Sequence, residues 1–390
     1  MFDFSVPVDR HGTWCTQWDY VADRFGAADL LPFTISDMDF PTAPCILEAL
    51  QKRLAHGVLG YSRWKNEDFL GAIAHWYQRR FNSTIDAESV VYGPSVIYMV
   101  SQLVRQWSQP GDGVLIHTPA YDAFYKAIEG NQRQVLSAPL QNTANGWQCD
   151  MAALEALLAR PECKIMLLCS PHNPTGKVWT RAELELMADL CELHGVRVIS
   201  DEIHMDMVWG ENRHIPWCEV GRGGWALFTS GSKSFNIPAL TGAYGLINHE
   251  EDRQHYLNVL KGQDGLSSPA VLAIVAHIAA YQEGEPWLEA LRAYLQSNLQ
   301  FVADSLNRAF PELNWQPPQS TYLAWVDLRP LGLDDRELQK VLIEQQKVAI
   351  MPGYTYGVEG NGFIRLNAGC PRIKLEAGVE RLIAGIRSLQ

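Results

Sequence analysis

The most regular feature of this chain is an alternation between helical and strand-like patterns of apolar residues. Within 44–54, Ile46, Leu50 and Leu54 are spaced so that they share one face of a helix, and we expect Thr42 to cap its start. The same periodicity predicts further helices over 66–81, 96–107, 181–194, 286–310 and 335–346.

Short apolar runs separate these helices and predict strands. They are nearly continuous rather than alternating, which is typical of a parallel sheet covered by helices on both faces. The predicted fold is therefore α/β, with a mostly parallel sheet flanked by helices. The runs lie at 90–92, 114–117, 165–169, 196–200, 225–230 and 243–247.

The pattern changes near residue 286, where a long helical stretch is followed by short strands at 323–327, 348–351 and 363–366. We interpret this change as a domain boundary. The predicted large domain covers 46–285, and the predicted smaller α/β domain combines 1–45 with 286–390.

Composition narrows the functional classes. The 390 residues are 47% hydrophobic and carry a net charge of −12, which argues against a nucleic-acid-binding surface. The eight cysteines form no CxxC pair, and no stretch of 18 apolar residues occurs. The first residues show no basic leader followed by an apolar run, and we expect no signal peptide. We therefore expect a protein of a reducing compartment, the cytoplasm, with no membrane partner.

Ligands of open α/β sheets bind at the carboxyl ends of the strands. Lys233 follows the predicted strand 225–230 in Ser-Gly-Ser-Lys, beside the hydroxyls of Ser230 and Ser232. An amine there, next to hydroxyls that can donate hydrogen bonds to a phosphate, suits covalent chemistry. The alternative is a solvated loop lysine.

Asp201 follows the strand 196–200, where a buried carboxylate needs a cation. A protonated pyridine nitrogen is such a cation, and a helix N-cap is the alternative role. Nearby, His204, Asp206 and His214 suggest a metal site, but no H-E-x-x-H spacing is present and we expect no metal.

Four further segments follow predicted strands or lie within them. Asn173 belongs to Asn-Pro-Thr-Gly, which by itself makes a tight turn. Ser95 and Val96 open a helix whose backbone N–H groups suit a phosphate. Tyr121 is placed to stack on a planar ring or simply to pack in the core. Arg365 lies in an apolar strand and needs an anion, either a substrate carboxylate or a structural partner.

Together these segments resemble the fold-type I pyridoxal-phosphate (PLP) enzymes, the aspartate aminotransferase superfamily, over essentially the whole chain. Five motifs occur in the typical order, namely an aromatic residue at 121, Asn-Pro-Thr-Gly at 173–176, Asp201, Ser-x-Ser-Lys ending at 233, and Arg365. The fold class implied is that of the superfamily, with PLP as cofactor.

Within the superfamily, four segments are similar to the carbon–sulfur β-lyase branch, the cystathionine β-lyases. They are Pro-Phe-Thr-Ile-Ser-Asp-Met-Asp-Phe at 32–40, Gly-Tyr-Ser at 60–62, Ser-Asp-Glu-Ile-His-Met-Asp at 200–206 and Met-Pro-Gly-Tyr-Thr-Tyr-Gly at 351–357. The likeness extends to enterobacterial members that also repress the maltose transcriptional activator. It therefore implies that activator as a second, protein partner.

The resemblance implies a role for each matching residue. Lys233 would join PLP as a Schiff base and later move the substrate Cα proton, and Asp201 would pair with the pyridine nitrogen. Asn173 would bond the phenolic oxygen, Tyr121 would stack on the ring, and Arg365 would bind the substrate carboxylate.

The resemblance also implies a phosphate site and a homodimer. The phosphate would be held by Ser230, Ser232, the N–H groups near Ser95 and Val96, and Tyr61 of the partner subunit. Two positions depart from the aminotransferase pattern: His204 stands where a tyrosine is common, and Thr241 stands where an arginine often binds phosphate.

The implied reaction is α,β-elimination from L-cysteine-type thioethers and disulfides, such as cystathionine and cystine, giving pyruvate, ammonia and a thiol. Either Tyr121 or Lys233 would protonate the leaving sulfur. An aminotransferase on the same fold is the main alternative. A regulator acting through protein contact, beside or instead of catalysis, is the second.

Overall fold

A computed structural model describes residues 2–390, which divide into two compact units. The large unit comprises Thr42–His172 and Lys177–Leu288, and the small unit comprises the residues up to Pro41, Asn173–Gly176 and Glu289–Gln390. The domain bounds drawn from the sequence remain a prediction.

The large unit is built on an eight-stranded sheet of order β2-β9-β8-β7-β6-β3-β4-β5. Neighbours from β8 through β7, β6 and β3 to β4 run parallel, whereas β9 runs antiparallel to both β2 and β8, and β5 antiparallel to β4. The strands are β2 (Val90–Gly93), β3 (Gly113–Thr118), β4 (Gln134–Thr143), β5 (Gly146–Cys149), β6 (Cys163–Cys169), β7 (Arg197–Asp201), β8 (Trp225–Thr229) and β9 (Ala243–Ile247).

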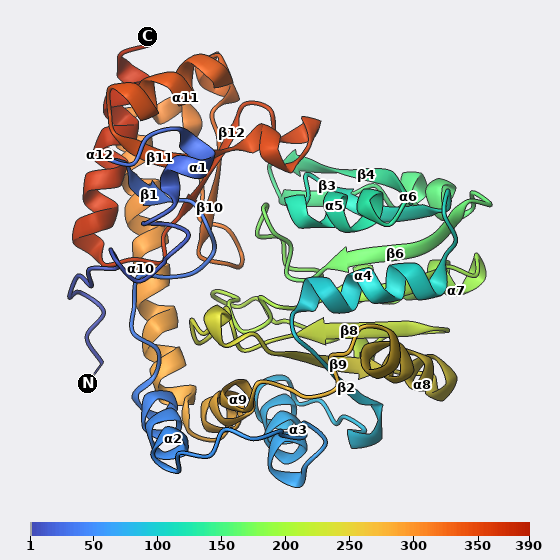
Figure 1. Ribbon diagram of the computed structural model, residues 1–390. Helices are drawn as coiled ribbons and strands as arrows, with labels where there is room; N and C mark the ends of the chain where they lie inside the picture. Colours follow the sequence, from blue (N-terminus) through green and yellow to red (C-terminus); the bar gives the residue numbers. More distant parts are fainter. Residues whose placement is uncertain (1) are drawn as a thin grey trace. The chain divides into compact units, whose positions relative to one another are not determined.

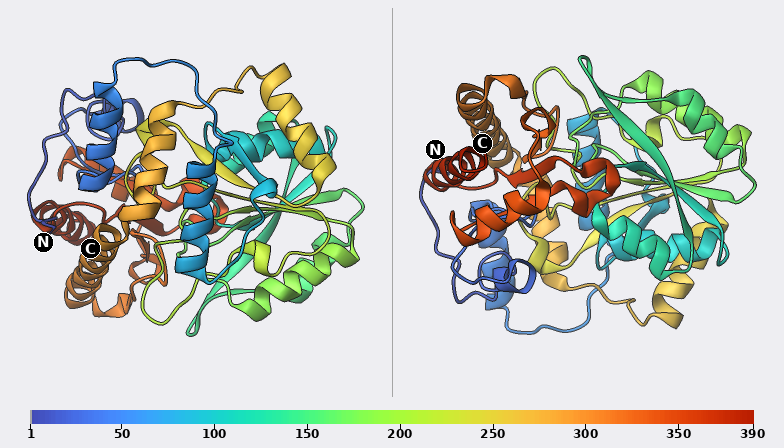
Figure 2. Two further views of the ribbon diagram at one scale, coloured as in Figure 1. Left: turned by 90° about the horizontal axis from the view of Figure 1, so that it is seen from below. Right: turned by 90° about the horizontal axis from the view of Figure 1, so that it is seen from above.

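Helices lie on both sides of this sheet (Figure 2). The apolar strand residues are buried between them, as the continuous apolar runs predict. The helices are α2 (Pro44–Ala55), α3 (Glu67–Phe81), α4 (Val96–Trp107), α5 (Asp122–Gly130), α6 (Met151–Leu158), α7 (Arg181–Leu193), α8 (Glu250–Asn258) and α9 (Val271–Glu283), with 3₁₀ turns at Ala87–Ser89, Trp217–Glu219 and Pro238–Leu240 and a π turn at Val259–Gln263.

The small unit has a four-stranded sheet of order β1-β11-β12-β10. Its helices α11 and α12 pack against β11 (Figure 1). Its elements are α1 (Val21–Phe25), β1 (Leu31–Phe33), most of α10 (Glu285–Ala309), β10 (Leu323–Asp327), α11 (Asp335–Glu344), β11 (Val348–Pro352), β12 (Phe363–Asn367) and α12 (Arg372–Arg387), with 3₁₀ turns at Pro311–Leu313, Arg329–Leu331, Gly353–Tyr356 and Val358–Gly360.

The predicted α/β fold class is confirmed, and every helix and strand predicted from the apolar pattern is present within a few residues. The prediction that Thr42 caps α2 is wrong. Ala43 occupies the N-cap position without a side-chain bond, and the Thr42 hydroxyl instead donates to the carbonyl of Phe235 at 2.6 Å.

The β4–β5 hairpin was not predicted from the sequence. Much of its outer half is exposed, so its apolar pattern is weak. Within residues 2–390, no helix combines the length and the apolar character needed to cross a bilayer.

Candidate active site

Six strands of the large unit end at one edge of its sheet. β3, β4, β6, β7 and β8 run parallel, and β2 shares their direction because it is antiparallel to β9, which is itself antiparallel to β8. The segments that follow these strands therefore meet at their carboxyl ends, the usual ligand site of an α/β sheet.

Asp201 is the last residue of β7 and is buried. Its Oδ1 accepts a hydrogen bond from the N–H of Ile203 at 3.1 Å. Burial raises the pKa of Asp201 to about 7, while the Ile203 bond and the positive charge of Lys233 lower it. The structure thus brings Asp201 and Lys233 within electrostatic reach of each other, although 32 residues separate them in the chain (233 − 201).

Lys233 lies in a turn after β8 that its neighbours hold in place. The Ser230 hydroxyl donates to the carbonyl of Gly242 at 2.7 Å, and its oxygen accepts from the N–H of Ser232 at 3.1 Å. On the other side of Lys233, the Ser234 hydroxyl donates to Asp206 Oδ2 at 2.7 Å. The hydroxyls of Ser230 and Ser234 therefore hold the turn on both sides of Lys233.

Ser95 and Val96 lie where β2 passes into α4. The Ser95 hydroxyl accepts from the N–H of Tyr98 at 3.2 Å and so caps the helix, whose first turn carries no acidic residue. The N–H groups of the first turn and the helix dipole make this end favourable for an anion.

Tyr121 and His204 also follow strands of this edge. Tyr121 is half-buried at the start of α5, after β3, and meets Phe124 edge-on with ring centroids 5.7 Å apart. His204 is buried in the turn after β7. By contrast, Tyr61 is 99% exposed in the loop before α3.

Asn173 and Arg365 belong to the small unit, where they contact each other. Arg365 is buried in the middle of β12; its Nη1 donates to Asn173 Oδ1 at 3.1 Å and its Nη2 to the carbonyl of Thr34 at 2.9 Å. Its guanidinium also lies 4.8 Å from the ring centroid of Tyr356. Among residues 2–390, no carboxylate pairs with Arg365 and its Nε has no hydrogen-bond partner.

Comparison with known proteins identifies the family. A model described as aminotransferase class I and II matches residues 28–382. The chain belongs to this family.

The most similar relatives include the protein MalY of Escherichia coli, 74% identical over 390 residues that cover all of both chains. The cystathionine beta-lyase PatB of Bacillus subtilis is 34% identical over 98% of this chain and all of its own. Among solved structures, the PLP-bound C–S lyase of Staphylococcus hominis has a TM-score of 0.93 at 28% identity, covering 99% of this chain and 98% of that one. Cystalysin of Treponema denticola, described with its PLP cofactor, also has a TM-score of 0.93, at 27% identity and full coverage of both chains.

The residues of this family member fit the cofactor named for its relatives. A buried carboxyl whose pKa rises to about 7 favours a cationic ring nitrogen, which would keep it ionised. The start of α4 offers N–H groups to a phosphate, and the lysine beside Asp201 offers an amine.

Sequence reasoning missed His277 and the role of Asp206. His277 is buried in α9; its Nε2 accepts from the N–H of Gly231 at 3.0 Å, and its Nδ1 lies 2.7 Å from the Ala273 carbonyl. Burial lowers the pKa of His277, and an accepting Nε2 requires the neutral ring with its proton on Nδ1. No motif marks this residue, because its partner is a backbone atom 46 positions away.

Asp206 was considered above only as a metal ligand. It instead accepts from Ser234 and, at 3.2 Å, from Trp76 Nε1, and Arg80 Nε lies 3.6 Å away. The described residues contain no group of three or more His, Cys, Asp or Glu side chains that could hold a metal ion. Asp206 therefore anchors the lysine turn to α3.

The raised pKa of Asp201 predicts how the stability of the cofactor-free protein depends on pH. The native state binds the Asp201 proton more tightly than the unfolded state, whose reference pKa is 3.8. The contribution of Asp201 to the free energy of unfolding should therefore fall as the pH rises from 3.8 to about 7 and level off above it. In urea unfolding of the cofactor-free protein, Asp201→Asn should remove this part of the pH dependence and be more stable than the parent at pH values above 7.

The matched control is Asp189→Asn, which changes a carboxylate with 64% exposed side chain in the same unit. It should keep the pH dependence of the parent. Equal slopes for the parent and Asp201→Asn between these pH values would contradict the assignment.

Proposed function

We propose that the chain is a PLP-dependent carbon–sulfur β-lyase acting on L-cysteine-type thioethers and disulfides such as cystathionine and cystine. The observation that carries the proposal is that Lys233 lies near enough to the buried Asp201, at the ligand edge of the sheet, for its charge to lower the pKa of that carboxyl. The similarity to PLP-bound C–S lyases and to cystathionine beta-lyases supports it. The products are pyruvate, ammonia and a thiol, or a persulfide where the substrate is a disulfide, with one water consumed.

When bound, the cofactor withdraws electrons from the substrate Cα through its protonated ring. Asp201 keeps the ring nitrogen protonated, and the buried position of Asp201 makes that ion pair strong. Ser232 and the N–H groups at Ser95 and Val96 hold the phosphate, joined by Ser230 once its hydroxyl turns from the carbonyl of Gly242 to the phosphate. Tyr121 stacks on the ring and His204 lines it.

Lys233 carries the cofactor and then acts as the base. The Lys233 amine would hold the cofactor covalently and, once released when substrate binds, would be free to remove the Cα proton. The bonds of Ser230 and Ser234 fix the turn on both sides of the lysine, which limits where its amine can reach. Tyr121 or Lys233 delivers a proton to the leaving sulfur.

Arg365 binds the substrate carboxylate in this proposal. The support is that it is buried with no carboxylate partner among residues 2–390, and that its planar fork matches a carboxylate. Because Asn173 uses Oδ1 to accept from Arg365, its amide nitrogen is the atom that donates to the phenolic oxygen of the cofactor.

The lyase and the aminotransferase share proton removal from Cα and differ in the products. With the holoenzyme, L-cystathionine and no added keto acid, we expect pyruvate, ammonia and thiol in equal amounts. Lys233→Ala should lower the rate by at least about a hundredfold, because it removes both the covalent anchor and the base. Borohydride reduction and peptide mapping of the parent should find the cofactor on Lys233.

Lys261→Ala is the matched control, since it removes an exposed lysine of the same unit and should keep full activity. Transfer of the amino group to an added keto acid without release of thiol would favour the aminotransferase instead. Labelling of another lysine would overturn the site itself.

We also propose a homodimer in which Tyr61 of the partner subunit reaches the phosphate. Tyr61 is 99% exposed, and its neighbours Val58 and Leu59 are 63% and 62% exposed, which is costly for a monomer and typical of an interface.

Sedimentation should give twice the chain mass of 43.8 kDa. Tyr61→Phe should weaken cofactor binding about tenfold by removing one hydrogen bond to a charged group, whereas Tyr20→Phe should not. A monomer at micromolar concentration would contradict the proposal.

We further propose that the chain represses the maltose transcriptional activator through protein contact in the cytoplasm. The support is the resemblance described above and the full-length similarity to MalY. All eight cysteines are free thiols, in keeping with a reducing compartment.

Lys233→Ala should still repress a maltose reporter in cells that lack the wild-type chain. Loss of repression in this variant, with the protein still folded, would show that the two activities are not separable.

A further inference from the structure

Residues 34–39 of the small unit form no helix or strand, yet almost all of them are buried or half-buried. Buried backbone carbonyls need donors, and here side chains from elsewhere in the unit supply them. Five consecutive carbonyls are bonded in this way: Thr34 to Arg365, Ile35 and Asp37 to Asn367, Ser36 to Tyr322, and Met38 to Arg10. The path of this segment is therefore fixed residue by residue.

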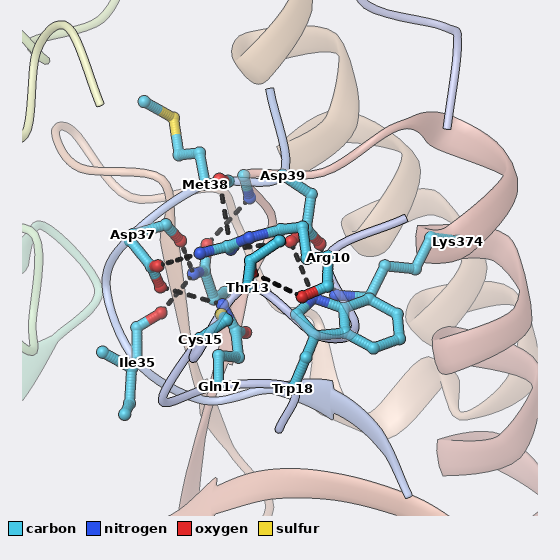
Figure 3. A network of polar contacts seen from close by, with 12 residues as sticks. Arg10, Thr13, Cys15, Gln17, Trp18, Ile35, Asp37, Met38, Asp39 and Lys374 are labelled. Atoms are coloured by element: carbon cyan, nitrogen blue, oxygen red, sulfur yellow. Dashed lines mark hydrogen bonds and ion pairs between the residues drawn. The ribbon is translucent and has the colours of Figure 1, made fainter. Parts of the chain in front are cut away.

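The two carboxylates of the segment anchor it to the N-terminal residues. Figure 3 shows the Arg10 guanidinium directed at both Asp37 and Asp39; its Nη2 contacts Asp37 Oδ2, and its Nη1 lies 2.9 Å from Asp39 Oδ1. Asp39 also accepts from Trp18 Nε1 at 2.9 Å and from Lys374 Nζ at 2.6 Å. Burial raises the pKa of Asp39, but Lys374, Trp18 and Arg10 outweigh it and hold the pKa below its usual value.

Gln17 joins this ionic cluster to Thr34. Its side chain is buried, with 2% of the residue exposed. Its amide nitrogen donates to Asp37 Oδ1 at 3.0 Å, and its amide oxygen accepts from the N–H of Thr34 at 3.2 Å. Both ends of one amide are therefore used, one on a carboxylate that Arg10 holds and one on the backbone of Thr34.

The next peptide group completes the path, because the carbonyl of Thr34 accepts from Arg365 Nη2 at 2.9 Å. An unbroken series of contacts thus runs from Arg10 through Asp37, Gln17 and Thr34 to the guanidinium of Arg365. Arg365 has no carboxylate among the described residues to orient it. The contacts just described and the bond to Asn173 therefore determine the orientation of its guanidinium plane.

We propose that Gln17 is a positioning residue for the substrate carboxylate, acting on Arg365 through the backbone of Thr34. Arg10 and Asp37 hold Gln17 in place. The inference rests on the proposed role of Arg365. Because a bidentate arginine–carboxylate pair depends on the angle between two planes, a small rotation of the guanidinium weakens it strongly.

The test compares two amines that differ only in the carboxylate. L-alanine has no leaving group at Cβ, and L-alaninol carries a hydroxymethyl group in place of the carboxylate. The dissociation constant of each is measured on the holoenzyme from the change in visible absorption of the cofactor. Gln17→Leu, which keeps the volume but removes both hydrogen bonds, should weaken L-alanine about tenfold and leave L-alaninol unchanged.

Arg10→Lys provides a graded second variant. A lysine keeps the charge but cannot contact both Asp37 and Asp39 with a planar fork, so its effect on L-alanine should be smaller than that of Gln17→Leu. Arg329→Met is the matched control. Arg329 pairs with Asp327, and its guanidinium lies over the ring of Phe363, which is on the same strand, β12, as Arg365. No contact joins Arg329 to the described residues 34–39. It should change neither dissociation constant. Thermal unfolding by circular dichroism confirms that each variant is folded.

Arg365→Met separates the inference from the proposal on which it rests. If this variant does not weaken L-alanine relative to L-alaninol, the proposed role of Arg365 fails. If it does but Gln17→Leu does not, Arg365 binds the carboxylate and the positioning role of Gln17 is wrong. An equal loss for both amines in Gln17→Leu would also overturn the inference, because it would indicate a general structural effect.

Discussion

The site of this protein depends on a carboxylate buried at the end of a strand. Burial alone would favour the protonated form of Asp201, and the nearby charge of Lys233 opposes it. Because these two effects oppose each other, the fraction of Asp201 that is ionised changes strongly when a cationic ring binds beside it or leaves. The sheet makes the arrangement possible, since parallel strands bring the ends of β7 and β8 together at one edge.

Around this pair, irregular backbone is held rigid by side chains rather than by secondary structure. The lysine turn is bonded by Ser230 and by Ser234 through Asp206. It is also bonded by His277 of α9 and by Thr42, which precedes α2, both distant in the chain. The Phe235 ring at its end is fully buried and stacks on Trp287 with centroids 5.9 Å apart. A base that must reach one proton needs such a support, because a loose turn would pay the ordering entropy during the reaction.

Side chains also fix the irregular backbone of residues 34–39 in the small unit, where five consecutive carbonyls accept hydrogen bonds from side chains. In both places the backbone takes a path that neither a helix nor a strand could provide. The cost is a set of buried polar groups that must all be paired, which makes each supporting residue sensitive to substitution.

The sequence by itself determined many of the helices and strands, and the candidates that follow strand ends, such as Asp201 and Lys233. It could do so because apolar periodicity and position after a strand are local properties. Only the tertiary structure decided that Asp206 accepts from Ser234, that Thr42 bonds Phe235 instead of capping a helix, that His277 accepts from Gly231 and that Gln17 accepts from Thr34. These residues act on backbone or side-chain atoms far away in the chain, and a hydrogen bond between distant residues leaves no periodic pattern in the sequence.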